Sequence, residues 1–242
     1  MRIGVFADVH ANLEALEAVL GILRQQGVTH FACCGDIVGY GPDPGRCCDI
    51  ICQLRCPVVA GNHDYGVLGR TRVADFNPDA AAALRWTREQ LTEDQLLLLD
   101  GLPLTTVRKP LLLVHGSPSA PEQWEYIFTV REAEEEMRHF SEDICIVGHT
   151  HYPFAVAKPA GQPAQLIRAQ SFQLAPGVKY LVNAGSVGQP RDGDPRACGL
   201  VLDTTNRTIT FFRVPYDVAR VQHKIIAAGL PESLAARLAV GR

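Results

Sequence analysis

The sequence has no excess of basic residues and no long apolar segment. Its 23 lysines and arginines are outnumbered by 26 aspartates and glutamates, which gives a formal net charge of -3 at pH 7. Nucleic-acid-binding proteins usually carry a strongly basic patch, so we expect no nucleic-acid partner. No stretch reaches the roughly 18 consecutive apolar residues that a membrane-spanning helix needs, so we expect no membrane partner.

The amino-terminal stretch also lacks the pattern of a secretion signal. A signal peptide has a longer apolar core and a cleavage site of small residues, whereas here a carboxylate follows early, at Asp8. We therefore expect a cytoplasmic protein whose eight cysteines are free thiols. Cys48, Cys52 and Cys56 recur every four residues, which predicts one shared helix face. The absence of a C-x-x-C pair favours buried apolar packing over a zinc site.

Length and composition are those of an ordinary globular chain. A chain of 242 residues, 47% of them hydrophobic, forms one large domain or two small ones. The candidate site residues described below extend from position 8 to position 151 and must fold together. We therefore predict a single domain over residues 1–242.

Short apolar runs alternate with helical patterns in the first part of the chain. Runs at 2–7, 31–34 and 58–60 predict strands, and leucines at helical spacing follow the first of them. Pro44 after Asp43 has the pattern of a helix start. This alternation predicts an α/β fold with a parallel or mixed sheet.

Further helices are predicted between the motif regions and near the end of the chain. Asn77-Pro78 predicts a helix start, and Thr92 with Gln95 fits a capping box. These helices, at about 65–100, are predicted to form a lid or cap. Later patterns predict a helix at 132–140, strands at 111–114 and 144–147, and a helical tail from about 217.

Polar residues follow five of the apolar runs. One such group alone is weak support for a site, because a lone histidine beside a strand is usually structural. Five groups are hard to explain by packing, since burying them without partners would cost several kcal/mol apiece. Carboxylate and imidazole groups suit manganese, iron, zinc and nickel ions. The residues concerned are Asp8, His10, Asp36, Asn62, His63, His115, His149 and His151.

The spacing within two of these groups has a simple geometric interpretation. Residues i and i+2 of an extended chain point to the same side. Asp8 and His10 could therefore hold one ion if the backbone there is extended. His149 and His151 share this spacing and could offer imidazoles to two neighbouring ions.

Taken in order, these groups resemble the motifs of the calcineurin-like metallophosphoesterases. The motifs are D-x-H at 8–10, G-D at 35–36, G-N-H-D at 61–64, H-G at 115–116 and G-H-x-H at 148–151. The stretches 8–12 and 183–191 are most similar to small bacterial phosphodiesterase and diadenosine-tetraphosphatase-like members. The resemblance implies a four-layer α-β-β-α sandwich of two mixed sheets.

The resemblance also implies a site with two divalent transition-metal ions. We expect manganese first, with iron, zinc or nickel as alternatives. His63 would be catalytic without binding metal, facing the substrate phosphate and helping the leaving group depart. One ion would be held by Asp8, His10, Asp36 and His151, and the other by Asp36, Asn62, His115 and His149, with Asp36 as the bridge.

The sequence departs from the protein Ser/Thr phosphatases of this family. Those enzymes carry Asp and Arg where this chain has Gly39 and Tyr40, so His63 loses its usual partner and phosphoprotein phosphatase activity is not expected. The adjacent Asp64 is a possible replacement partner. Arg191, in a glycine-rich loop, could replace the missing phosphate contact. Further candidate substrate-binding residues are Asn12, which could instead cap the first helix, and Tyr40, which could instead be a packing residue.

These observations predict a phosphoesterase in which a hydroxide bridging two metal ions attacks small phosphodiesters or phosphomonoesters. The alternative enzyme is a symmetrical dinucleoside polyphosphate hydrolase. A subunit of the retromer coat resembles this fold but serves as a scaffold, a role that the complete ligand set and His63 disfavour. The acidic balance disfavours a nuclease. The expected partner is a small phosphorylated substrate, and no oligomeric state is predicted.

Overall fold

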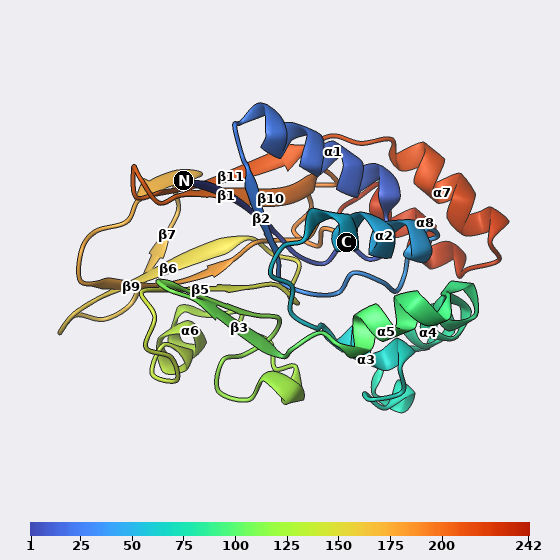
Figure 1. The fold of residues 1–242 in the computed structure, drawn as a ribbon, viewed down its shortest axis with the longest axis horizontal. Helices are drawn as coiled ribbons and strands as arrows, with labels where there is room; N and C mark the ends of the chain where they lie inside the picture. Colours follow the sequence, from blue (N-terminus) through green and yellow to red (C-terminus); the bar gives the residue numbers. More distant parts are fainter.

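The computed structural model describes residues 1–242 and contains two β-sheets that pack face to face. Helix α1 (Leu13–Gln25) covers the outer face of one sheet and helix α6 (Val130–Glu136) that of the other (Figure 1). The fold is therefore the α/β sandwich of two mixed sheets that the sequence resemblance implied.

The first sheet has the strand order β2-β1-β10-β11-β8. Strands β1 and β2 are parallel, and the other neighbours are antiparallel. The strands are β1 (Arg2–Phe6), β2 (His30–Cys33), β8 (Ser171–Gln173), β10 (Ala197–Asp203) and β11 (Thr208–Val214).

The second sheet has the strand order β3-β4-β5-β9-β6-β7. Strands β4, β5 and β9 are parallel to one another, whereas β3, β6 and β7 pair antiparallel with their neighbours. The strands are β3 (Thr105–Arg108), β4 (Leu111–Val114), β5 (Ile144–Val147), β6 (Phe154–Pro159), β7 (Gln165–Ile167) and β9 (Val178–Asn183).

Six further helices complete the fold, and none of the helices is long and apolar enough to cross a membrane. Two of them, α7 and α8, lie beside α1 and α2 at one end of the molecule (Figure 1). They are α2 (Pro44–Leu54), α3 (Asn62–Val67), α4 (Pro78–Gln90), α5 (Glu93–Asp100), α7 (Val218–Ala227) and α8 (Glu232–Leu238), together with 3-10 turns at Val73–Asp75 and Pro121–Gln123.

The apolar strands are explained by burial on both faces. Successive side chains of a strand point to opposite faces. Val5 and Ala7 of the first strand region lie in the core between the sheets, whereas Phe6 packs in the core under α1. In β5, Ile146 faces the inner core and Val147 faces the core under α6. Both faces of these strands are covered, so their sequences are continuous apolar runs without alternation.

The predicted helix starts at 77–80 and 92–95 are confirmed. The side chain of Asn77 accepts the Ala80 backbone N–H, and Thr92 and Gln95 form the reciprocal capping box. The start at Pro44 is also found, but the Asp43 side chain does not cap the helix. It accepts a hydrogen bond from Lys224 instead.

Three local predictions were wrong. Residues 58–60 form no strand, because only Val58 makes an isolated bridge, to Cys33. The helix predicted at 132–140 runs from 130 to 136 and then tightens, because the amides of Arg138 and His139 bond carbonyls only three residues back. Helix α2 ends at residue 54, so Cys56 lies beyond it and does not share a helix face with Cys48 and Cys52.

Candidate metal centre

The predicted ligands converge at one end of the two sheets, just after the strands that precede them. Asp8 follows β1, Asp36 follows β2, His115 follows β4, and His149 follows β5. Their side chains are buried, with residue exposures of 4% or less. Asn62 is half-buried at the first position of α3. Ligands far apart in the sequence therefore meet because the carboxyl ends of β1, β2, β4 and β5 meet.

The backbone at these ligands is left-handed, so the extended chain on which the i, i+2 interpretation of 8–10 and 149–151 depended is not found. Non-glycine residues rarely adopt positive φ, which costs about 1–2 kcal/mol per residue. The ligands nevertheless converge, because the turns project the side chains from tight loops. Positive φ angles occur at Asp8 (54°), His10 (47°), Asp36 (52°), His149 (70°) and His151 (60°).

The ligand atoms form two groups that share Asp36. The first contains Asp8, His10, Asp36 and His151, and the second contains Asp36, His115 and His149. The Asn62 Oδ1 atom lies 3.2 Å from His115 Nε2 and so adjoins the second group. This is the grouping that the sequence resemblance implied.

Distances within the groups suit metal coordination. His10 Nε2 lies 3.1 Å from His151 Nε2, and His115 Nε2 lies 3.1 Å from His149 Nδ1. Asp36 Oδ2 lies 3.6 Å from His10 Nε2 and 3.3 Å from His115 Nε2. Two ligands bound at about 2.1 Å to one ion lie roughly 3.0–3.4 Å apart at octahedral or tetrahedral angles. Three of these four distances lie in that range and the fourth is slightly longer, so the spacing and the nitrogen and oxygen donors fit divalent transition-metal ions.

Backbone carbonyls orient all four histidines. A carbonyl only accepts hydrogen bonds, so the ring nitrogen that contacts it carries the proton. The other ring nitrogen is then free to bind a metal, and in each case it is the nitrogen that faces the cluster. The pairs are His10 Nδ1 with Val38 O (3.1 Å), His115 Nδ1 with Cys34 O (2.7 Å), His149 Nε2 with Trp124 O (2.7 Å) and His151 Nδ1 with Gln189 O (2.6 Å).

Burial and nearby charge set the protonation of the site. Burial holds the pKa values of His10 and His149 well below the usual histidine value and also lowers that of His151. Burial opposes a charge on His115 too, but the carboxylates of Asp36 and Asp8 raise its pKa to about 9. Three of the imidazoles are thus in the neutral form that binds metals, and a metal must displace a proton from His115.

His63 lies beside the cluster without belonging to it. Its Nδ1 atom is buried and has no hydrogen-bond partner. Asp64 is not that partner, because its carboxylate accepts the backbone N–H groups of Ile37, Val38 and Gly61. Burial lowers the pKa of His63 to about 4, so the ring is neutral near pH 7.

The absence of a side chain at Gly39 makes room for the His63 ring. A Cβ atom at Gly39 would lie 2.4 Å from His63 Nδ1, so any other residue would collide with the ring. The position that carries Asp in the protein Ser/Thr phosphatases therefore faces His63 here as well. The ring is oriented by packing against Tyr40 and Phe76, with centroid distances of 4.4 and 5.0 Å.

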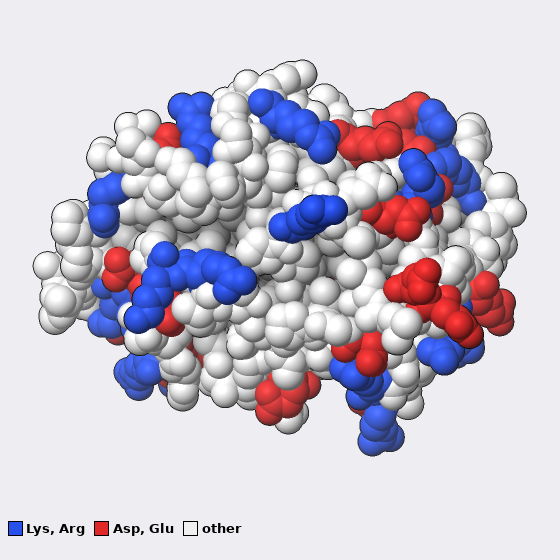
Figure 2. All heavy atoms as spheres, viewed as in Figure 1, with Lys and Arg blue, Asp and Glu red and all other residues white.

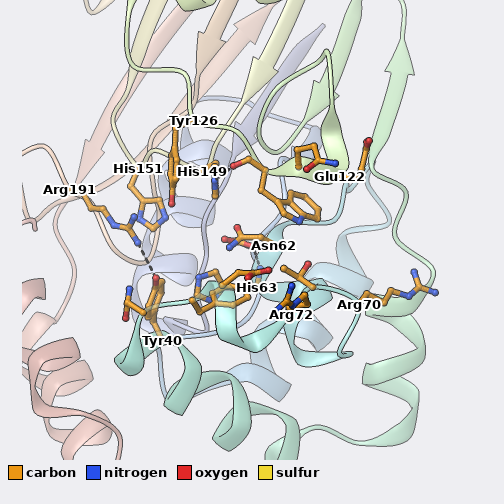
Figure 3. A pocket seen from close by; sticks show the side chains of 17 residues that line it. Tyr40, Asn62, His63, Arg70, Arg72, Glu122, Tyr126, His149, His151 and Arg191 are labelled. Carbon is orange, nitrogen blue, oxygen red and sulfur yellow. Dashed lines mark hydrogen bonds between the residues drawn. The ribbon is translucent and has the colours of Figure 1, made fainter.

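A cleft of about 590 Å³ opens above this cluster and receives most of the predicted substrate-binding residues (Figure 3). Arg191 and Tyr40 both line it, with Arg191 Nη2 3.4 Å from the Tyr40 hydroxyl. Asn12 does not line it, against our expectation of substrate contact. Asn12 Oδ1 accepts the Ala15 N–H at the start of α1, and its Nδ2 donates to Gly188 O. The helix-cap interpretation of Asn12 is therefore the one that the structure supports.

Several cleft residues were not anticipated from the sequence. Tyr126 stacks on the His149 ring at 4.0 Å, and the Trp124 carbonyl orients that ring. Arg72 lies across the cleft from Tyr126 (Figure 3), and Phe76 also lines the cleft. All four come from irregular segments between elements, where no periodic pattern or motif marks them. Arg70 also lines the cleft, but its guanidinium is paired with Asp100.

Comparison with known proteins places this chain in a family. Residues 1–207 match the model of the calcineurin-like phosphoesterase superfamily domain. An uncharacterised protein of Methanocaldococcus jannaschii is 39% identical over 99% of this chain and 98% of its own length. The crystal structure of a metallophosphoesterase from Sphaerobacter thermophilus is 40% identical, with a TM-score of 0.87 over 100% of this chain and 99% of that one. A hypothetical protein of Pyrococcus horikoshii, 22% identical, shares the fold with a TM-score of 0.82 over 100% and 98% of the two chains. The chain belongs to the calcineurin-like phosphoesterase superfamily.

Proposed function

We propose that this protein is a dinuclear metal-dependent phosphoesterase that hydrolyses small phosphodiesters or phosphomonoesters. The observation that carries the proposal is the pair of buried ligand groups that share Asp36 at the floor of an open cleft. Two divalent ions there would supply a nucleophilic hydroxide near neutral pH and neutralise charge on the phosphoryl oxygens. Manganese is our first choice, with iron, zinc or nickel as alternatives, because the donors are carboxylate and imidazole groups.

Two residues of the chain would act on the substrate directly. His63 lines the cleft, and its ring can donate an N–H to the leaving oxygen or to a phosphoryl oxygen. The Arg191 guanidinium would bind the phosphate, since arginine suits phosphate recognition. The positive charge of Arg191 acts on the site, because it contributes to lowering the pKa values of His63 and His151.

Small esters are our first choice over symmetrical dinucleoside polyphosphates. The Tyr126 ring, which lies beside the metal ligand His149, is already stacked against His149 and Phe128, so it is less available to stack on an adenine ring. The face in Figure 2 carries interspersed basic and acidic side chains without a continuous basic surface. Together with the formal net charge of -3, this mixed face favours a small substrate over a nucleic acid.

The test is hydrolysis by metal-stripped protein with and without added Mn²⁺. The substrates are bis-p-nitrophenyl phosphate, p-nitrophenyl phosphate and diadenosine tetraphosphate. We expect metal-dependent turnover, fastest with one of the two nitrophenyl esters. His63→Ala should lower kcat by about 10²–10⁴-fold and leave the metal content unchanged, because His63 is not a ligand. No turnover of any substrate by protein shown to hold two ions would contradict the proposal and favour a protein-binding scaffold.

A further inference from the structure

The two C-terminal helices lie beyond the matched family domain, yet they pack directly behind the cleft. The family match ends at residue 207, whereas α7 begins at Val218. Leu234 and Leu238 of α8 share a buried apolar cluster with Tyr40, which lines the cleft. The same cluster includes Ala80 and Ala83 of α4. Tyr40 is thus supported from below by α8 and α4.

Ion pairs fix these helices to the rest of the domain. Lys224 Nζ of α7 lies 2.6 Å from a Glu14 carboxylate oxygen in α1 and 2.8 Å from Asp43 Oδ2, just before α2. Arg220 pairs with the same Glu14 oxygen at 3.0 Å. The helical pair is therefore held against α1 and the start of α2, close to Tyr40 in the sequence.

Gly241 contacts the loop that carries Arg191. Its carbonyl accepts the Gly193 backbone N–H at 2.9 Å. It is buried, with φ of +63°, and a Cβ atom there would lie 2.7–2.8 Å from the Asp194 backbone. Only glycine fits between this segment and the loop without displacing one of them.

The packing of α8 and the contact of Gly241 support two cleft residues, Tyr40 and Arg191, that also contact each other. The Arg191 guanidinium lies 5.7 Å from the centre of the Tyr40 ring and contacts its hydroxyl. The backbone N–H of Arg191 donates to the His151 carbonyl at 3.3 Å, so the loop that carries Arg191 is joined to a metal-ligand segment. Tyr40 is thus supported by Leu234 and Leu238, and the Arg191 loop by Gly241.

We propose that α7, α8 and the segment through Gly241 are a positioning element of the cleft. They set the positions of Tyr40 and Arg191 relative to the metal centre and so determine how tightly phosphate is held. This inference rests on the proposed function, in which Arg191 binds the substrate phosphate. Neither the two helices nor Gly241 supplies a ligand atom to either group, so changes here should alter phosphate affinity and leave the metal content intact.

The test compares Gly241→Ala with Val240→Ala, a matched control at an exposed neighbouring position. In metal-loaded protein we expect Gly241→Ala to raise KM for bis-p-nitrophenyl phosphate and the inhibition constant of inorganic phosphate. We expect each of these two constants to rise about tenfold, as when one hydrogen bond to a charged group is partly lost. The values for kcat and bound metal should stay near those of the parent protein. Leu238→Ala, which loosens Tyr40, should also raise both constants, and it should lower kcat as well because Tyr40 packs against the His63 ring.

A double-mutant cycle with Arg191→Gln separates positioning from general destabilisation. If Gly241 acts through Arg191, Gly241→Ala will not raise KM further once Arg191 is replaced. The inference is overturned if the effects of Gly241→Ala and Arg191→Gln on KM are additive, or if Gly241→Ala has a KM as low as that of Val240→Ala. The phosphoesterase proposal stands in either case. Unchanged phosphate affinity in Arg191→Gln would overturn both the phosphate role of Arg191 and this inference. Absence of all turnover in the parent protein would count against the proposed function alone. The affinity for inorganic phosphate can then be measured by calorimetry in the parent protein and the three variants of the cycle, so the inference is still tested.

Discussion

Replacing Gly39 by alanine tests whether His63 is positioned for catalysis by the space beside it. The added Cβ atom would lie 2.4 Å from His63 Nδ1 and 3.0 Å from its Cγ. Unbonded heavy atoms pack at about 3.5 Å, so the ring must move by about 1 Å. The φ angle of Gly39 is +87°, which adds about 1–2 kcal/mol of backbone strain for any other residue.

A displacement of this size at a catalytic group costs about 10²-fold in rate. We therefore expect Gly39→Ala to lower kcat for bis-p-nitrophenyl phosphate by about 10²-fold, while elemental analysis shows the same metal content as the parent protein. Gly161→Ala is the matched control. Gly161 also has positive φ (+70°), but a Cβ atom there would meet nothing within 4 Å. It should lose about 1 kcal/mol of stability and no activity.

The His63→Ala background isolates the cause. Gly39→Ala should have no further effect on kcat there, because the group that it displaces is already absent. The reasoning is refuted if Gly39→Ala keeps the parent kcat, or if its loss of activity follows a loss of metal.

Two further predictions concern the metal centre and its histidines. Asp36→Asn should weaken the binding of both metal ions, because Asp36 Oδ2 lies within 3.6 Å of ligand nitrogens in both groups. Dialysis followed by elemental analysis measures the ions that remain. One retained ion would show that Asp36 is not shared. In metal-free protein the pKa of His63 is lowered by burial to about 4, so the unfolded chain binds the extra proton first as the pH falls below about 6.5. The free energy of unfolding should therefore fall as the pH is lowered from 6.5 to 4, and the complete loss due to His63 is roughly 3 kcal/mol. Urea unfolding of the parent and of His63→Gln at pH 7 and 4.5 measures the difference, and equal losses in the two proteins would contradict the assignment.

The sequence predicts the elements that burial controls. Residues 2–7 and 144–147 are apolar throughout because each strand is covered on both faces, and this pattern is visible without a structure. Capping at Asn77 and Thr92 is equally local and was predicted correctly. The family motifs then supply the sandwich, which no local pattern specifies.

The conformation of the ligand loops could not be predicted in the same way. The i, i+2 spacing of Asp8 and His10 suggested an extended chain, whereas both residues have positive φ. Non-glycine residues adopt this conformation only where tertiary contacts enforce it, and such contacts join segments distant in sequence. The same applies to Trp124, whose carbonyl orients His149 although nothing in its neighbourhood of the sequence marks that role.

The strain at the ligands is sustained by hydrogen bonds between the loops. The Asp8 N–H donates to the Gly35 carbonyl at 3.0 Å, and the His10 N–H donates to the Asp36 carbonyl at 2.9 Å. The Gly188 N–H in turn donates to the Asp8 carbonyl at 2.8 Å. Each bond joins a ligand loop to a loop from another strand, so the loops hold one another in the left-handed conformation. These bonds between loops fix the backbone segments that present the ligands. That arrangement accounts for the strained backbone at Asp8, His10 and Asp36 in a fold whose strands are otherwise regular.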